Sequence, residues 1–255
     1  MTLARLTLPL ALLTFCSASP GATISIPALK DNTIYQDATV ALSNGNGEFI
    51  HTGVTKEGVL RRGLIAFDIA GNLPAGAVIT NVTLTMNMAQ ANDVGTTAAS
   101  SLHRLLADWG EGTSNAVGGE GGGAPATAGD ATFVNRFHPG TPWTTPGGDF
   151  VPVASATTDV TGLGLYAWSS PSMVADVQDW LGDASNNFGW IIRTGDEVLL
   201  GTGKRFDSRT NPELANRPSL TIEYVVVPEP GTGGLLAIAG LLFGGWAARR
   251  GVARR

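Results

Sequence analysis

Residues 77–90 read AVITNVTLTMNMAQ, and apolar and polar side chains alternate along the whole stretch. Successive side chains of a β-strand point to opposite faces, so this alternation indicates a strand with one face in the core. The stretch therefore predicts a long, half-buried strand. Its core face is expected to consist of Val78, Thr80, Val82, Leu84, Met86 and Met88.

Shorter stretches of the same character flank this strand on both sides. β-branched, aliphatic and aromatic residues dominate them, and Gly, Asn, Asp and Pro separate them. We expect strands at residues 34–42, 63–69, 102–107, 188–193, 198–206 and 219–226. Many short strands predict an all-β fold, and their number fits a single jelly-roll-like β-sandwich.

Two segments depart from the strand pattern. Met173, Val177 and Trp180 recur at helical spacing after Ser170-Pro171. This predicts one short helix, with serine as the N-cap and proline at the first helical position. Residues 118–129 begin with GGEGGG and have no periodicity, so they predict a flexible surface loop.

The N-terminus has the layout of a secretory signal peptide. Arg5 precedes an apolar run at residues 6–15, and small residues follow as far as Ala22. This order is typical of a signal peptide rather than a membrane span, so residues 1–22 are expected to be removed. Cys16 is the only cysteine, and the mature protein is then expected to contain no disulfide. A lipoprotein signal at Cys16 is disfavoured by the bulky Phe15 before it.

The C-terminus contains an apolar stretch between prolines and arginines. Residues 231–248 carry no charge, and 18 residues in a helix span roughly 27 Å, enough for a bilayer core. Positive charges flanking such a span stay in the cytoplasm, so the body is expected outside. The span predicts a C-terminal transmembrane helix that stops at Arg249, Arg250, Arg254 and Arg255.

Pro228, Glu229 and Pro230, followed by the apolar stretch and the arginines, resemble the PEP-CTERM sorting signal. The resemblance implies that residues 227–255 are recognised by an exosortase, a membrane-embedded cysteine transpeptidase that cleaves near Pro-Glu-Pro. It further implies export through the inner membrane, transient anchoring by the C-terminal helix, and delivery to the cell surface or extracellular matrix. An ordinary C-terminal anchor with a proline-stiffened linker is the alternative.

The charge of the mature chain restricts its partners. Residues 23–226 contain 11 basic and 20 acidic residues, a net charge of −9. No basic patch is evident in the sequence, and an acidic surface repels nucleic acid. Nucleic acid is therefore not an expected partner.

Residues 23–226 are expected to form one domain, and several of their motifs resemble the secreted DNRLRE-type β-sandwich domain, whose relatives include carbohydrate-binding modules. The motifs are GLIAFD at 63–68, DWGEG at 108–112, VQDWL at 177–181, NFGW at 187–190 and FDSR at 206–209. The glycine-rich segment after residue 113 departs from that family, in which a shorter step is usual. The resemblance implies a β-sandwich and a link to carbohydrate.

Two candidate sites follow from residue chemistry. Trp109 and Trp143 adjoin Gly, Pro or Asp, and an exposed indole can stack on a sugar ring, so both are candidate carbohydrate contacts. Asp37, Asn44, Asn46 and Glu48 offer oxygen ligands that calcium favours, so structural calcium is the one cofactor considered, against a plain turn.

No motif for catalysis is present. The chain has no Gly-x-Ser-x-Gly sequence, and its three histidines are widely spaced. The leading interpretation is a non-enzymatic surface or extracellular-matrix protein. A carbohydrate-binding module for exopolysaccharide is the alternative, and a polysaccharide-active hydrolase or lyase is the third.

Overall fold

The computed structural model describes residues 21–226, in which Gly21–Val225 form one compact unit. The strands are β1 (Ala22–Pro27), β2 (Lys30–Tyr35), β3 (Leu42–Ser43), β4 (Phe49–Val54), β5 (Leu60–Ala66), β6 (Ala77–Ala91), β7 (Ala98–Arg104), β8 (Ala124–Pro125), β9 (Asn135–Phe137), β10 (Thr141–Pro142), β11 (Ala156–Val160), β12 (Gly164–Ser169), β13 (Trp190–Thr194), β14 (Lys204–Asp207) and β15 (Ser219–Val226). The helices of this range are α1 (Pro171–Gly182) and two short 3₁₀ turns, η1 (Ala184–Asn186) and η2 (Leu214–Asn216). The predicted all-β body with one short α-helix is confirmed.

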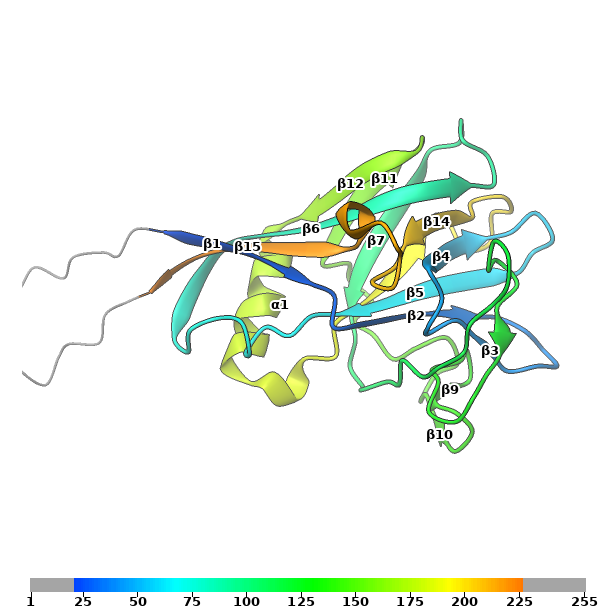
Figure 1. The fold of residues 1–255 in the computed structure, drawn as a ribbon, viewed down its shortest axis with the longest axis horizontal. Coiled ribbons are helices and arrows are strands. Elements are labelled where there is room, and N and C mark those ends of the chain that lie inside the picture. The colour runs from blue at the N-terminus through cyan, green and yellow to red at the C-terminus, as the bar shows by residue number, and fades with distance from the viewer. Residues whose placement is uncertain (1–20, 227–255) are drawn as a thin grey trace, which may run out of the picture. The chain divides into compact units, whose positions relative to one another are not determined.

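Most of the strands belong to one sheet that curls on itself (Figure 1). Its order is β1-β15-β6-β14-β4-β5-β13-β7-β11, with β12 paired to β6 and β2 paired to β5. β4 forms the corner, because residues 49–52 pair with β14 whereas Gly53 and Val54 pair with β5. Gly53 has a φ of 83°, and a Cβ there would lie 2.6 Å from the carbonyl oxygen of Thr202. Only glycine fits this corner.

The main core lies between the two halves of the curled sheet. One half contributes residues of β6, β12 and β14, and the other contributes residues of β5, β7 and β13. These side chains form one buried cluster that includes Ile65, Val82, Leu84, Met86, Met88, Leu102, Trp168, Trp190, Ile192 and Phe206. The described strands therefore form a curled sheet that encloses its own apolar core.

The half that contains β5 and β13 is buried on its outer face as well. Leu64 and Ile191 belong to a second buried cluster, together with Trp109 and Trp143 from the long segment between β7 and β11. A strand that is buried on both faces has apolar residues at successive positions instead of alternating apolar and polar residues. This explains the unbroken apolar runs at residues 64–67 and 190–192.

The long strand β6 differs from its predicted pattern at one end. Val82, Leu84, Met86 and Met88 are buried as expected, but Val78 is exposed and Ile79 is buried instead. At this end, Gln178 of α1 accepts a hydrogen bond from the Ile79 amide at 2.9 Å and donates one to the Ala77 carbonyl at 3.1 Å. The predicted alternation is therefore wrong at its start, where the backbone bonds a helix.

Two other predicted strands are too long. β2 ends at Tyr35, and residues 36–40 form an exposed bend rather than the continuation expected as far as residue 42. β14 begins only at Lys204, because Val198, Leu199 and Leu200 lie in an exposed loop. Apolar residues alone predicted a strand here, and these side chains remain in solvent.

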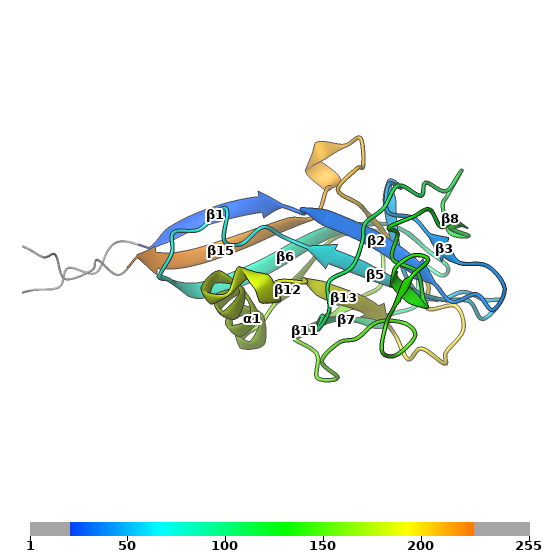
Figure 2. The same cartoon turned by 90° about the horizontal axis from the view of Figure 1, so that it is seen from below.

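Helix α1 begins as its sequence predicts. The Ser170 hydroxyl accepts a hydrogen bond from the Met173 amide at 3.1 Å, and Pro171 occupies the first turn. Met173, Val177 and Trp180 are buried and cover one end of the main core beside β6 (Figure 2). The helix therefore closes the end of the sandwich.

The two chain ends lie outside the described residues. The predicted signal peptide (1–22) begins there, and so does the predicted transmembrane helix of the 227–255 segment, so the structure does not test either one. Across residues 21–226, no helix combines the length and apolarity that crossing a membrane requires. β1 and β15 pair antiparallel, with Ala22 opposite Tyr224, so the first and last described strands lie side by side (Figure 1).

Candidate functional site

A polar cleft of about 620 Å³ lies at the corner formed by β4, and we call it the cleft. His51 of β4 lies in its wall, with β5 and β14 on either side of that strand. The glycine-rich loop, residues 118–123, provides another wall. The lining residues are His51, Thr55, Glu57, Arg61, Gln90, Ala91, Asn92, Val117, Gly119, Glu120, Gly121, Gly122, Gly203, Lys204 and Arg205.

Three cationic side chains line the cleft. They are Arg61 from β5 and Lys204 and Arg205 from β14, and none of them forms an ion pair among residues 21–226. Two of the three, Arg61 and Lys204, are buried, and Glu57 and Glu120 also line the cleft, so the cations do not form an exposed basic patch. Arg61 and Arg205 are far apart in sequence, and the pairing of β5 and β14 with β4 brings them to one site.

The ring of His51 is neutral and lies against Arg61. Burial lowers the pKa of His51 to about 3, and the charges of Arg61 and Arg205 lower it further, against a weaker opposing effect of the Gly119 backbone. Arg61 Nη1 lies 3.4 Å from His51 Nδ1. A guanidinium can only donate, so Nδ1 accepts and the proton is on Nε2. Nε2 is buried beside the Gly119 backbone.

The two arginines differ in how they are held. Arg61 is buried and donates from Nη1 to the Gly121 carbonyl at 3.1 Å, while its Nε has no partner. The Arg205 guanidinium lies 3.8 Å above the ring centre of Phe49, and its buried Nε also has no partner. Burial lowers the pKa of both arginines from the ordinary value. Both keep unused donors.

Lys204 is nearly fully buried and has a different role. Its Nζ donates to the Thr96 carbonyl at 2.7 Å and, at 3.4 Å, to the Asp93 carbonyl. Burial lowers the pKa of Lys204, and the nearby Asp93 charge partly offsets this. Lys204 therefore holds the 93–96 turn beside the cleft.

Glu120 fixes the glycine-rich loop, which was expected to be a flexible surface loop. Its carboxylate accepts hydrogen bonds from Asn44 Nδ2 at 2.7 Å and from the amides of Glu48 and Phe49, each at 3.0 Å. Its carbonyl accepts a bond from the Tyr35 hydroxyl at 2.9 Å. Glu120 is buried with a φ of 61°, so the loop is anchored at its centre and the expectation is corrected.

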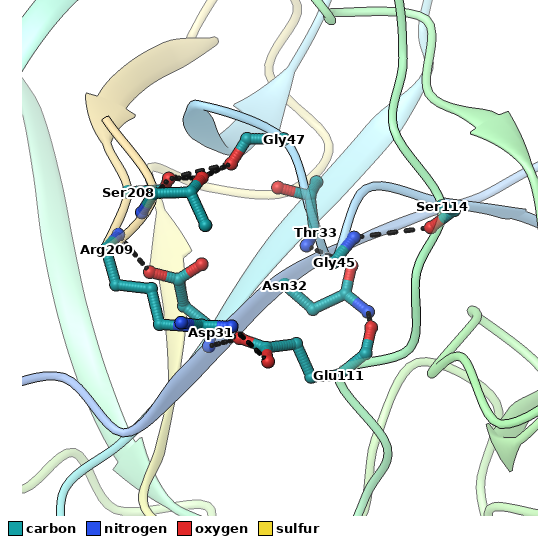
Figure 3. Close-up of polar contacts among 10 residues, drawn as sticks. Asp31, Asn32, Thr33, Gly45, Gly47, Glu111, Ser114, Ser208 and Arg209 are labelled. Carbon is teal, nitrogen blue, oxygen red and sulfur yellow. Dashed lines mark hydrogen bonds and ion pairs between the residues drawn. The ribbon is translucent and has the colours of Figure 1, made fainter. Parts of the chain in front are cut away.

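A second group of polar and charged side chains includes residues of β2, and we call it the polar cluster (Figure 3). It consists of Asp31, Asn32, Glu111, Ser208 and Arg209. The Glu111 carboxylate accepts two bonds from the Arg209 guanidinium and one from the Asp31 amide at 2.9 Å. Asn32 donates to the Glu111 carbonyl at 2.9 Å, so the cluster ties three distant segments together.

Asp31 is the acid of the polar cluster whose pKa is shifted from its ordinary value. Burial raises its pKa to about 7, a bond from the Arg209 amide at 2.7 Å opposes this, and the Glu111 charge adds to it. Perturbed acids often mark active sites, which makes Asp31 a candidate. However, Asp31 is 1% exposed and does not line the cleft. A substrate cannot reach it, and the geometry is that of a structural junction.

Trp109 and Trp143 lie in the second apolar cluster rather than on the surface. They are 1% and 3% exposed, and their indole nitrogens donate to the carbonyls of Phe188 and Thr132, each at 2.9 Å. Neither ring presents a face on which a sugar could stack. The prediction of carbohydrate contacts at these two residues is therefore corrected, because the doubly covered sheet needs both rings for packing.

The four candidate calcium ligands are not arranged as a ligand set. Asp37 Oδ1 accepts bonds from the amides of Thr39 and Val40 in its own turn. Asn44 is buried, whereas Asp37, Asn46 and Glu48 are exposed. Asn44 Oδ1 accepts a bond from the Ala116 amide at 2.9 Å. No group of three or more His, Cys, Asp or Glu in the described part of the chain could hold a metal ion. This arrangement does not support the calcium prediction.

The sequence contains one signal that could have indicated the cleft, namely two basic dipeptides. Arg61-Arg62 and Lys204-Arg205 are both basic pairs near the start of a strand. Such pairs are common on strand ends, and nothing local shows that the two strands share a neighbour. The cleft therefore could not be assembled without the strand order.

Comparisons with known proteins concern the C-terminus. Residues 226–255 match the family of the PEP-CTERM protein-sorting motif, which contains Pro228, Glu229 and Pro230 and the four arginines from Arg249 to Arg255. A comparison of the chain with curated proteins gives no match. The matched motif identifies the chain as a secreted protein that is targeted by exosortase and sorted to the cell surface.

Proposed function

We propose that the body of this protein binds polysaccharide in the cleft, without cleaving it, and so acts as an adhesive surface or matrix protein. The observation that carries the proposal is the cleft itself, whose wall includes Arg205, a partly exposed guanidinium that forms no ion pair within residues 21–226. Polar side chains with free donors are the groups that fix a sugar in a binding site. The sorting motif delivers the body to the surface, where exopolysaccharide is met.

The acids of the cleft favour binding over catalysis. Glycoside cleavage needs a carboxyl group that is protonated near neutral pH beside a second, ionised one. A hydrogen bond from Thr55 lowers the pKa of Glu57, and three N–H donors engage the Glu120 carboxylate. The one acid with a pKa near 7, Asp31, lies elsewhere. A hydrolase or lyase therefore remains the less favoured proposal.

Binding of polysaccharide by the body, residues 21–226, tests the proposal, since this range contains a compact unit with its own core. The ligands are dextran, polygalacturonate, dextran sulfate and the exopolysaccharide of the producing cells. We expect saturable binding to at least one of them and no release of reducing or unsaturated ends. Absence of saturable binding would overturn the proposal, and released ends would replace it by an enzyme.

A matched pair of glycine variants locates the binding. A Cβ added at Gly122, which lines the cleft, or at Gly140, which does not, meets no atom within 4 Å. We expect Gly122→Trp to fill the cleft and weaken binding at least roughly tenfold, which corresponds to about 1.4 kcal/mol. Gly140→Trp should leave binding unchanged. Equal binding by both variants would place the polysaccharide outside the cleft.

A further inference from the structure

We infer that Arg205, Arg61 and the glycine-rich loop form a subsite for an oxyanion, the carboxylate or sulfate ester of an acidic polysaccharide. This inference rests on the proposed function and names the ligand class of the same cleft. It goes beyond the body's resemblance to other β-sandwich domains, because the glycine-rich loop is the segment in which this chain departs from them.

The Arg205 guanidinium has no anionic partner within residues 21–226, and packing holds it in place. Stacking over Phe49 at 3.8 Å holds the guanidinium in place, and its side chain makes no hydrogen bond or ion pair within residues 21–226. Five donors in a rigid fork match the two oxygens of a carboxylate or sulfate. A fixed guanidinium loses little conformational entropy on binding, which favours tight recognition.

Arg61 adds a second, buried cation to the wall of this subsite. Its Nη1 donates to the Gly121 carbonyl at 3.1 Å, and its Nε has no hydrogen-bond partner within residues 21–226. Taking a cation out of water without a counter-ion is costly, and an anion in the cleft would offset that cost. Burial lowers the pKa of Arg61, and the nearby Tyr35 and Glu57 oppose this only in part. His51 beside it is buried and neutral, so it adds no charge.

The loop packs its backbone against both guanidinium groups. A Cβ on Gly121 would lie 3.1 Å from Arg61 Nη1, and one on Gly119 would lie 3.6 Å from Arg205 Nη1. The backbone therefore approaches both guanidinium groups closely because these positions lack side chains. The Gly121 carbonyl accepts the bond from Arg61 Nη1, so the loop holds Arg61 in the wall of the subsite.

The two acids of the cleft do not fill this subsite. Glu120 directs its carboxylate to Asn44 and the amides of Glu48 and Phe49, so it anchors the loop. Glu57 is exposed and hydrogen-bonded by Thr55. The unpaired charges that remain available are those of the two arginines.

Removing the stacked guanidinium tests the inference. The probes are polygalacturonate for carboxylate, dextran sulfate for sulfate ester and dextran as the neutral polymer. We expect the wild-type body to prefer one or both polyanions and to lose affinity as salt rises, because salt screens exposed charge. Arg205→Gln should weaken polyanion binding at least roughly tenfold, and Arg205→Lys should recover only part of it, since it keeps charge without the fork.

Arg136→Gln is the matched control. Arg136 also lies over an aromatic ring, Phe137 at 5.5 Å, but it does not line the cleft. Its loss should leave binding unchanged, and thermal unfolding should show that all three variants are folded. Equal binding of dextran and both polyanions, or polyanion binding unaffected by Arg205→Gln, would overturn the inference.

The outcomes separate the inference from the proposed function. Dextran binding that is lost in Gly122→Trp but kept in Arg205→Gln would support the polysaccharide function and overturn the anion subsite. Binding of free galacturonate that needs Arg205, without binding of any polymer, would support the subsite and overturn the polysaccharide function. The relative affinities for polygalacturonate and dextran sulfate identify the anionic group.

Discussion

The polar cluster and the cleft both remove charged side chains from water, but only the polar cluster pairs them. Arg209 holds Glu111 with two hydrogen bonds, and Glu111 in turn accepts the Asp31 amide. In the cleft, Arg61 and Arg205 have no ion pair among the described residues. A buried charge without a partner costs stability, so its presence points to an external ligand. The paired charges of the polar cluster hold the fold together, and the unpaired arginines of the cleft are the groups that we propose to bind a ligand.

The largest loss of stability is expected from substitution of Trp109, which belongs to the second apolar cluster and lies close in sequence to Glu111 of the polar cluster. Trp109 lies two residues before Glu111, and its carbonyl accepts a bond from Lys30 Nζ at 2.6 Å. Trp109→Ala removes a fully buried indole and should lower the free energy of unfolding by about 4 kcal/mol. Urea unfolding measures the loss. If the two regions are independent, the variant binds polysaccharide as wild type does at temperatures where it is folded; weakened binding by the folded variant would show that the packing of Trp109 and the cleft are coupled.

The two regions should also respond to pH in opposite directions. The pKa of Asp31 is raised to about 7, so its stabilising contribution is present below about pH 4 and lost as pH rises to about 7. The pKa of His51 is lowered to about 3, so its contribution is present above about pH 6.5 and lost as pH falls. Each effect on the free energy of unfolding has an upper bound of roughly 5 kcal/mol.

Two variants separate these opposing contributions. Relative to wild type, Asp31→Asn should become more stable as pH rises from 4 to 7, and His51→Gln should become more stable as pH falls below 6.5. Unfolding by urea across this range gives both differences. A pH-independent difference for either variant would show that the side chain does not titrate in the folded protein as its burial predicts.

The smallest changes in the free energy of unfolding are expected from two arginine variants, one in each region. Arg209→Met leaves Glu111 unpaired beside Asp31 and should cost about 2 kcal/mol, less than a fully buried pair because both side chains are partly exposed. Arg205→Met removes a charge that has no protein partner and should change stability by less than about 0.5 kcal/mol. Similar losses in both would remove the distinction between the two regions.

The sequence predicts those parts of the fold that depend on local pattern. Alternation in β6 from Val82 to Met88 and the capping of α1 at Ser170 are both confirmed, because periodicity and caps act over a few residues. The pattern fails at Val78, where a side chain of α1 replaces a strand neighbour. It also fails at residues 198–200, which are apolar but have no sheet partner.

The candidate sites depended on information that residue types do not carry. Trp109 has polar and glycine neighbours in sequence, yet it is buried because β5 and β13 are covered on both faces. Glycine richness at residues 118–123 suggested flexibility, but a single residue, Glu120, fixes the loop through contacts with residues more than seventy positions away. Long-range contacts of this kind leave no local trace.

The destination of this protein could be predicted from its residues without the fold. The sorting motif is a contiguous segment, residues 226–255, so its pattern can be recognised in the linear order of the residues. The proposed binding site, by contrast, follows from the three-dimensional fold. Arg61 and Arg205 belong to strands that are distant in the chain, and they meet because β4 turns the corner at Gly53 and pairs with both.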